Sequence, residues 1–311
     1  MRLATLRHAE GGQHQLAFVG EEESFVPVLD AVQAAGVDAN QEVFAAEGVA
    51  WLRPEAMRLL ADLDATRAGD VPPLDPSVWR LAPPVLHPGK IIAVGRNYMD
   101  HVREGQEIWR KRGKTVAIPE FPSAFAKFSS SLTGPYDDIC LPEGLDDVDY
   151  EIELAVVIGK PALNVEEADA LDHVAGYAIC NDVATRGIQR REMEAQIGIT
   201  LAKNFPSFAP IGPWLTTADA VGDPQDLRVT LDVDGEVRQD ASTSDMIFTV
   251  AKLISYWSPM GLETGDILIT GTPSGVALAR EEPELYYLRA GQTVTARIEK
   301  LGELRNPVVR A

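Results

Sequence analysis

Glu151 and Glu153 are the first residues whose types and spacing suggest chemistry. They lie two positions apart in YEIELAVVIG, residues 150–159, which alternates like a strand and ends in an apolar run. Side chains two apart in a strand point the same way, and two carboxylates on one face repel unless a cation or a proton lies between them. Mg²⁺ takes oxygen ligands and keeps several waters, so two or three carboxylates suffice to hold it. The alternative is a solvated strand face on which the pair has no chemical role.

Asp182 is a third acidic residue in a setting that reads as buried. It ends the apolar stretch HVAGYAICND, residues 173–182, directly after a predicted strand. A buried acid needs a partner. Three acids from two strands would occupy one side of an octahedral ion and leave the other positions for water and substrate, as a catalytic metal site requires. The alternative is an Asx cap on a turn.

His101 and Glu104 form a candidate base pair in GRNYMDHVRE, residues 95–104. Residues three apart share a face of a helical turn. A carboxylate beside an imidazole orients it and raises its basicity, which suits a general base that takes a proton from water. Two other interpretations stay open, in which His101 is a metal ligand or the two residues are a surface ion pair.

Two further stretches could bind anions. Lys203 lies in LAKNFPSFAPIGPW, residues 201–214, where a held lysine would neutralise a developing oxyanion. The Gly-rich turn GTPSG, residues 271–275, offers backbone N–H groups and a hydroxyl to a carboxylate. A surface lysine and an ordinary turn are the alternatives. The sequence contains no GxGxxG, GxxxxGK[ST], GxSxG or HExxH motif, so any nucleophile is expected to be water rather than a side chain.

The elements that would position these residues are mostly strands. Alternating or apolar runs predict strands, an Asp234-Gly235 turn predicts a hairpin, and one amphipathic stretch with Asp245 at its start predicts a helix. The predicted strands and the helix cover residues 90–95, 151–159, 173–182, 227–240, 245–257, 266–271 and 292–300. This pattern predicts a mainly β fold with some α-helix, built as a mostly antiparallel sheet or a barrel-like roll.

The first 80 residues differ from the rest. They predict two short strands and two helices, and a stretch with six prolines in twenty residues, 71–90, follows them. Proline removes a backbone donor and fixes φ, so this stretch is interpreted as a linker. We expect a small N-terminal domain over residues 1–80 and a catalytic domain over residues 81–311.

Composition excludes some classes of protein. The formal net charge of −19 makes nucleic acids and anionic membrane surfaces poor partners. No 18-residue apolar run and no signal-peptide core is present, and the two cysteines form no framework of disulfides. A cytoplasmic protein is therefore expected, with no nucleic acid and no membrane as partner.

The order of the motifs resembles that of the fumarylacetoacetate hydrolase family. The resemblance covers about residues 88–309 and is carried in sequence by GRNYMDHVRE, FAKFSSSLTGPYDDICLP, YEIELAVVIGK, GYAICNDVATRGIQ, KNFPSFAPIGPW, TSDMIF, GDILITGTPSGV and LGELRNPV. It implies an α+β fold with a β-roll or barrel of mostly antiparallel strands, a small N-terminal α+β domain as in the longer members, and a homodimer.

The resemblance also implies roles for particular residues. It makes Glu151, Glu153 and Asp182 the ligands of Mg²⁺ or Mn²⁺, and His101, Glu104 and Lys203 the catalytic residues. It implies substrate-binding roles for Arg96, Gln189 and Thr272. Three positions depart from the family's usual pattern, because Ala184, Gly187 and Pro206 stand where a hydroxyl residue and two acids are expected.

The expected activity is metal-dependent hydrolysis of a C–C bond in a 2-oxo acid or β-diketone of the acylpyruvate type. In this interpretation the cation stabilises the enolate formed when the bond breaks, and the His–Glu pair activates water. An oxaloacetate-type decarboxylase and a hydroxymuconate-type isomerase or tautomerase remain alternatives, as does a relative that binds metal or ligand without catalysis. Aromatic catabolism is the expected setting.

Overall fold

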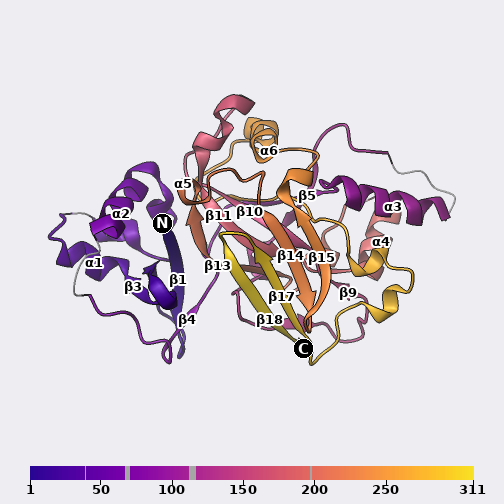
Figure 1. The fold of residues 1–311 in the computed structure, drawn as a ribbon, viewed down its shortest axis with the longest axis horizontal. Helices are drawn as coiled ribbons and strands as arrows, with labels where there is room; N and C mark the ends of the chain where they lie inside the picture. Colours follow the sequence, from indigo (N-terminus) through magenta and orange to yellow (C-terminus); the bar gives the residue numbers. More distant parts are fainter. Residues whose placement is uncertain (39, 67–70, 112–116, 197) are drawn as a thin grey trace.

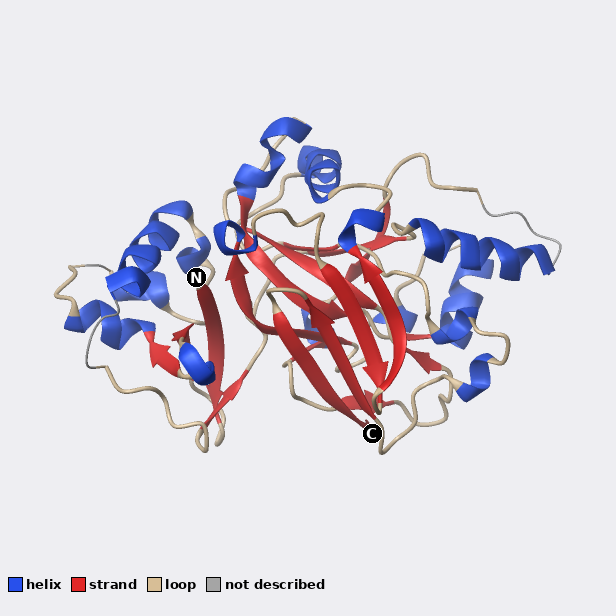
Figure 2. Ribbon diagram, viewed as in Figure 1, coloured by secondary structure: helices blue, strands red, loops and turns tan. Residues whose placement is uncertain are grey.

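The structure is a computed structural model that describes residues 1–38, 40–66, 71–111, 117–196 and 198–311. Figure 1 shows the N-terminal part at one side of the molecule and the larger body of strands beside it, with helices α3 and α4 at the opposite end. The strand-rich α+β class is confirmed (Figure 2), although the strands form open sheets rather than one closed barrel.

The large sheet runs through both parts of the chain. It has 11 strands, of which β4 (Trp79–Leu81) pairs with β1 and β7 (Leu132–Thr133) pairs with β13. The other nine follow in spatial order as β3 (Phe25–Pro27), β2 (His14–Val19), β1 (Arg2–His8), β13 (Ala209–Thr217), β11 (Val174–Asn181), β10 (Ile152–Ile158), β16 (Ile267–Ile269), β5 (Ile91–Gly95) and β6 (Ser123–Lys127).

A second sheet packs against the first. Its five strands are β15 (Glu236–Ser242), β14 (Arg228–Val233), β17 (Thr293–Ile298), β18 (Gly302–Arg310) and β8 (Ile139–Leu141). The predicted hairpin is confirmed, since β14 and β15 pair antiparallel and Asp234 and Gly235 between them have φ of 52° and 82°. A short pair, β9 (Val148–Asp149) with β12 (Ala184–Thr185), lies near the candidate ligands.

Strand β10 separates two hydrophobic cores. Ile152 and Leu154 point into the core shared with the second sheet, whereas Ala155 and Val157 point into a core that also contains Trp51 of the N-terminal part. Because side chains alternate across a strand, Glu151 and Glu153 lie on the same face as Ala155 and Val157. The two acids therefore continue a row of buried side chains.

The helices cover the sheets and their ends. They are α1 (Val28–Ala34), α2 (Pro54–Thr66), α3 (Met99–Lys111), α4 (Arg186–Glu194), α5 (Ala218–Val221) and α6 (Val250–Trp257). The start predicted for α6 at Asp245 is wrong. Asp245 instead ends a short 3₁₀ turn closed by a capping box with Ser242, and Thr249 is the N-cap that accepts a hydrogen bond from the backbone N–H of Lys252.

The proline-rich stretch contains one strand. Residues Trp79–Leu81 form β4, which pairs with β1. Strand β1 also pairs with β13, with Arg2 opposite Thr216. The N-terminal part thus adds its strands to the sheet of the larger part, and the division at residue 80 remains a prediction. Within the described residues, no helix combines the length and apolar character needed to cross a membrane.

Candidate metal centre

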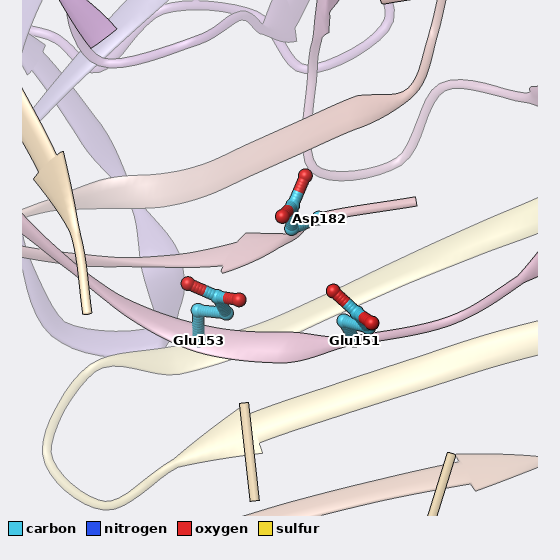
Figure 3. Close-up of side chains that lie close together, drawn as sticks. All are labelled: Glu151, Glu153 and Asp182. Atoms are coloured by element: carbon cyan, nitrogen blue, oxygen red, sulfur yellow. The ribbon is translucent and has the colours of Figure 1, made fainter. Parts of the chain in front are cut away.

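Three buried carboxylates meet where β10 and β11 lie side by side. Glu151 and Glu153 come from β10 and its N-terminal edge, and Asp182 directly follows β11, whose residue Asn181 is paired with Ile152. One oxygen from each carboxylate lies within 4.8 Å of the others. Their residues are only 7, 2 and 1% exposed, respectively. Figure 3 shows the three side chains facing a common point between the two strands.

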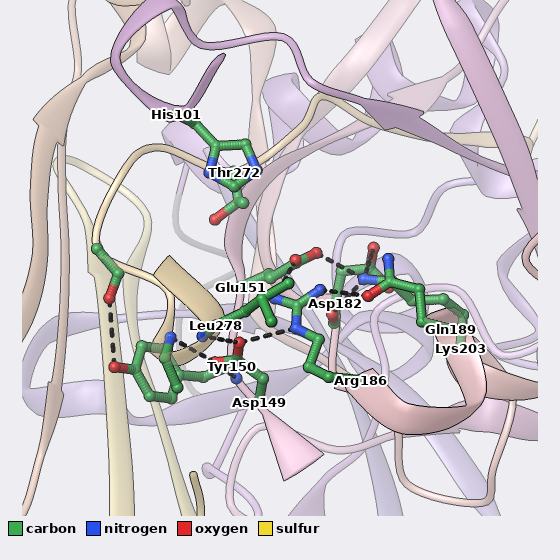
Figure 4. A network of polar contacts seen from close by, with 12 residues as sticks. His101, Asp149, Tyr150, Glu151, Asp182, Arg186, Gln189, Lys203, Thr272 and Leu278 are labelled. Carbon is green, nitrogen blue, oxygen red and sulfur yellow. Dashed lines mark hydrogen bonds and ion pairs between the residues drawn. The ribbon is translucent and has the colours of Figure 1, made fainter. Parts of the chain in front are cut away.

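Three buried cations surround these carboxylates. Lys203 Nζ lies 2.5 Å from Glu151 Oε2 and 2.8 Å from Asp182 Oδ2. Arg186 Nη2 lies 2.6 Å from Glu151 Oε1, and Lys127 Nζ lies 2.7 Å from Asp182 Oδ1. Figure 4 shows how Arg186 and Lys203 approach Glu151 from different directions. These cations explain how like charges can share a buried strand face.

The cations compensate the three acids unequally. Burial raises the pKa of Glu151, but the charges of Arg186 and Lys203 outweigh it, so its pKa falls to about 2. Among the residues that the structure describes, no cation contacts Glu153, which accepts a hydrogen bond of 2.6 Å from the Gly271 backbone N–H. Burial and the charges of Asp182 and Glu151 hold the pKa of Glu153 well above its usual value. Glu153 is therefore the carboxylate that an added cation would stabilise most.

The donor set fits a hard divalent cation. All three groups are oxygen donors, the set that Mg²⁺ and Mn²⁺ prefer. Among the described residues, buried Asp182 Oδ1 has no hydrogen-bond donor, because its contact with Lys127 is an ion pair without directed geometry. An acceptor that is held only by an ion pair, at the meeting point of three acids, can also take a metal ion as its partner.

His101 and Glu104 lie on helix α3, as the motif predicts. His101 Nδ1 is 3.6 Å from Glu104 Oε2, beyond hydrogen-bond distance. Glu104 instead accepts the backbone N–H of Gly275 at 3.0 Å, and within the described chain His101 Nδ1 has no hydrogen-bond partner. Figure 4 shows His101 above Glu151, with its ring directed toward the carboxylate network. Nδ1 itself is buried, but the His101 side chain is 20% exposed, so water or a substrate can reach the imidazole ring.

The other predicted site residues lie in distinct settings. Gln189 Oε1 accepts a hydrogen bond of 2.8 Å from Arg186, which places this amide beside the metal centre. Thr272 donates its hydroxyl to Ile152 O at 3.0 Å and accepts from Gln239 at 2.9 Å, so its proton is already engaged. Arg96 is exposed, at a positive φ of 56°, in the turn between β5 and α3. Their binding roles stay predictions.

The sequence analysis missed several residues that hold the site together. The sequence predicted no role for Arg186, Asp149 or Lys127. Asp149 accepts from Arg186 Nε at 2.8 Å and from the backbone N–H of Ala277 at 2.9 Å. The available signal was an acid in DVDYE two positions before Glu151, although in the structure Asp149 belongs to β9 and Glu153 to β10.

One departure from the family's pattern has a structural counterpart. Gly187 stands where an acid is usual, and its backbone N–H donates to the carboxylate of Asp147. A Cβ at position 187 would collide with that carboxylate. Asp147 therefore occupies the space that a side chain at position 187 would need.

Fold and site together define a protein with three buried carboxylates that could hold a metal ion, beside a histidine on a helix. The comparison with known families agrees, since residues 90–309 match the fumarylacetoacetate (FAA) hydrolase C-terminal family. This chain belongs to that family. The match confirms the resemblance and covers every predicted ligand and catalytic residue.

Its relatives carry different activities in their names. The human mitochondrial oxaloacetate tautomerase is 40% identical over 243 residues, which are 78% of this chain and 73% of that protein. The maleylpyruvate hydrolase of Sphingobium sp. SYK-6, solved with manganese(II) and pyruvate, has a TM-score of 0.75 at 30% identity over the full length of both chains. The 2-hydroxyhepta-2,4-diene-1,7-dioate isomerase of Mycobacterium marinum has a TM-score of 0.68 at 28% identity, covering 100% of this chain and 98% of that one.

Proposed function

We propose that this protein is a metal-dependent hydrolase that cleaves a C–C bond in a 2-oxo acid of the acylpyruvate type. The observation that carries the proposal is the place of His101, a partly exposed histidine on helix α3 above the three candidate ligands, whose Nδ1 has no hydrogen bond within the described chain. A partly exposed imidazole beside a group of metal-ligand candidates is suited to taking a proton from water. The manganese and pyruvate in the Sphingobium hydrolase structure support the same class of substrate.

The residues divide the work as follows. Glu151, Glu153 and Asp182 would hold Mg²⁺ or Mn²⁺, which when bound would draw electron density from the oxygens of a 2-oxo acid. His101 would take a proton from water as the water oxygen adds to the acyl carbonyl. The C–C bond then breaks and releases the carboxylic acid, and its electron pair stays on the 2-oxo acid fragment. The proton held by His101 would then pass to that fragment and complete pyruvate.

Lys203 contributes positive charge to this centre. Its ammonium donates to Glu151 Oε2, Asp182 Oδ2 and the Asp182 carbonyl at 2.5–2.9 Å, which uses its three N–H groups. An oxyanion role for Lys203 therefore requires one of these bonds to be exchanged for one to the substrate. Gln189 accepts a hydrogen bond from Arg186, and its amide would bind the substrate.

The test measures turnover on acylpyruvates that differ in their acyl group, with Mn²⁺ and after chelation with EDTA. We expect the protein to release pyruvate. EDTA should abolish this release, and added Mn²⁺ should restore it. Pyruvate release that survives chelation, or none on any acylpyruvate in the presence of Mn²⁺, would contradict it.

Oxaloacetate tautomerisation is the second candidate. It is favoured by the 40% identity to the human tautomerase and by the geometry of Glu104, which binds the Gly275 N–H rather than His101. A tautomerase needs His101 to move a proton but needs no activated water. The keto–enol interconversion of oxaloacetate, followed by ultraviolet absorbance beside pyruvate release, separates the two activities. A cytoplasmic setting, a role in aromatic catabolism and a homodimer remain predictions.

A further inference from the structure

Strand β6 holds the Lys203 segment at several points, through residues to which the proposed function assigns no role. Phe125 and Lys127 lie on one face of β6 because they are two positions apart. The Lys203 ammonium lies 5.3 Å from the centroid of the Phe125 ring, a cation–π contact. On the edge of the strand, Asn204 donates to Ala126 O at 3.1 Å and accepts from the Phe128 N–H at 2.6 Å.

Lys127 makes the most central of these contacts. Its ammonium donates to the carbonyl oxygens of Lys203 at 2.5 Å and Phe208 at 2.9 Å. It also forms the ion pair with Asp182 Oδ1 at 2.7 Å. Asp182 Oδ2 in turn binds the Lys203 ammonium, so Lys127, Asp182 and Lys203 form a closed ring of contacts.

Lys127 does not meet the substrate. Its side chain is 0% exposed, and its ammonium is surrounded by a carboxylate and two backbone carbonyls. An ammonium has three donors. A role in the reaction must therefore pass through the residues that Lys127 holds.

We propose that Lys127 is a positioning residue that fixes the segment carrying Lys203 beside the three carboxylates, while its charge competes with a dication for Asp182. The part of this inference that concerns turnover rests on the proposed function. The part that concerns the metal and the backbone does not.

The charge of Lys127 predicts an unusual pair of effects. A positive charge beside a ligand oxygen repels a dication, so its removal favours metal binding. Its removal also leaves the carbonyl group of Lys203 without this buried donor, whereas the carbonyl group of Phe208 keeps its bond from the Val183 N–H. The loss loosens the segment that carries the Lys203 ammonium. A general loss of structure would instead weaken metal binding and turnover together.

The experiment compares Lys127→Met with the wild type and with Lys90→Met. Lys90 pairs with buried Asp266 at 2.7 Å, outside the metal centre, so Lys90→Met is a matched loss of one lysine–aspartate pair. Hydrogen–deuterium exchange is measured over residues 201–208, where the amides of Lys203, Asn204 and Phe208 are hydrogen bonded. Mn²⁺ affinity is measured by calorimetry. The turnover number kcat is measured with an acylpyruvate as the substrate.

In Lys127→Met we expect at least tenfold faster exchange over residues 201–208, Mn²⁺ binding at least as tight as in the wild type, and kcat about 10–100-fold lower. Lys90→Met should change none of these. Unchanged exchange over residues 201–208, or Mn²⁺ binding that weakens, would overturn the proposal. If the wild type releases no pyruvate, the proposed function fails, while the exchange and Mn²⁺ results still decide the role of Lys127.

Lys127→Gln serves where the methionine variant does not fold. Its amide still has donors for the two carbonyls but carries no charge. We expect the exchange rate over residues 201–208 to lie between the rate of the wild type and the rate expected for Lys127→Met. Mn²⁺ binding should be at least as tight as in the wild type. Weaker Mn²⁺ binding or wild-type exchange in this variant would equally overturn the proposal.

Discussion

Glu153 is the least compensated carboxylate of the metal centre. Glu151 and Asp182 each contact buried cations, whereas the described contact of Glu153 is one backbone N–H from Gly271. Burial and the two neighbouring acids raise its pKa accordingly. In the absence of metal this residue destabilises the fold, and the same imbalance makes it a strong ligand when a dication is present.

Glu153→Gln should therefore have opposite effects on stability and metal binding. We expect the metal-free variant to unfold at a higher temperature than the metal-free wild type, since a repelled buried charge is removed. Its Mn²⁺ affinity should fall at least about 100-fold, because one of three ligands is neutralised. Thermal unfolding with and without Mn²⁺, and calorimetry, measure both. Asp266→Asn, which changes a buried acid outside the centre, is the control.

His101→Ala should lower the rate of hydrolysis without changing the affinity for the metal. Hydrolysis is expected to fall about 10²–10⁴-fold, the usual contribution of a general base. Mn²⁺ affinity should stay within about threefold of the wild type, because the three acids and their cations are untouched. Steady-state kinetics and Mn²⁺ calorimetry test this. Loss of Mn²⁺ binding in this variant would make His101 a ligand and refute its assignment as the base.

At the scale of elements, the turn at residues 271–275 connects the metal centre to helix α3. Gly271 donates to Glu153, Gly275 donates to Glu104, and the Thr272 hydroxyl binds the strand that carries the ligands. Gln239, a buried residue of the second sheet, donates to Thr272 and accepts from the Ile152 N–H. The turn therefore sets the position of α3 relative to the acids.

Gly275→Ala should disturb this connection. Gly275 has a φ of 104°, and a Cβ there would collide with the carbonyl oxygen of Arg238. The Gly275–Glu104 bond is then displaced, and kcat/KM is expected to fall about tenfold or more. Gly291→Ala is the control, because Gly291 also has a positive φ of 93° but open space around it. That control should lose only the roughly 1–3 kcal/mol of stability of a strained backbone, with kcat/KM near the wild type. Equal activity losses in both variants would contradict the role of the turn.

At the scale of the whole molecule, one sheet joins the N-terminal part to the catalytic part. Strand β1 pairs with both β2 and β13, so the strands β3, β2 and β1 extend the sheet that ends at β6. The core on that face mixes Trp51 and Leu60 of the N-terminal part with Ala155 and Ile269 of the other. The two parts share a core, which two independent domains would not.

Deletion of residues 1–80 should therefore expose β13 and one face of the core. An unpaired strand edge with apolar side chains beside it is prone to aggregation. We expect little soluble protein, in contrast with the full chain, as measured by soluble yield and size-exclusion chromatography. A soluble, folded fragment of residues 81–311 would show that the larger part is independent and would support the predicted domain division.

The sequence by itself determined the local features of this protein. Alternation predicted β10 and β11 and placed Glu151 and Glu153 on one face, and the Asp-Gly pair predicted the hairpin, because both signals depend on neighbours a few residues apart. The order of short motifs predicted the family, the three candidate ligands and the position of His101 and Glu104 on one helix. The start of α6 was predicted wrongly, because Asp245 caps an earlier 3₁₀ turn with the same side chain that would cap a helix.

Only the tertiary structure decided how the buried charges are balanced. The ion pairs of Glu151 with Arg186 and Lys203, and of Asp182 with Lys127 and Lys203, each join residues at least 21 positions apart. No periodicity brings an ammonium on β6 to an acid after β11. The same holds for the sheet that joins the N-terminal strands to β13, since strand pairing across some 200 residues depends on the packing of the whole chain. Local patterns can predict which side chains share a face, whereas the opposite charges that let them stay there come from the fold.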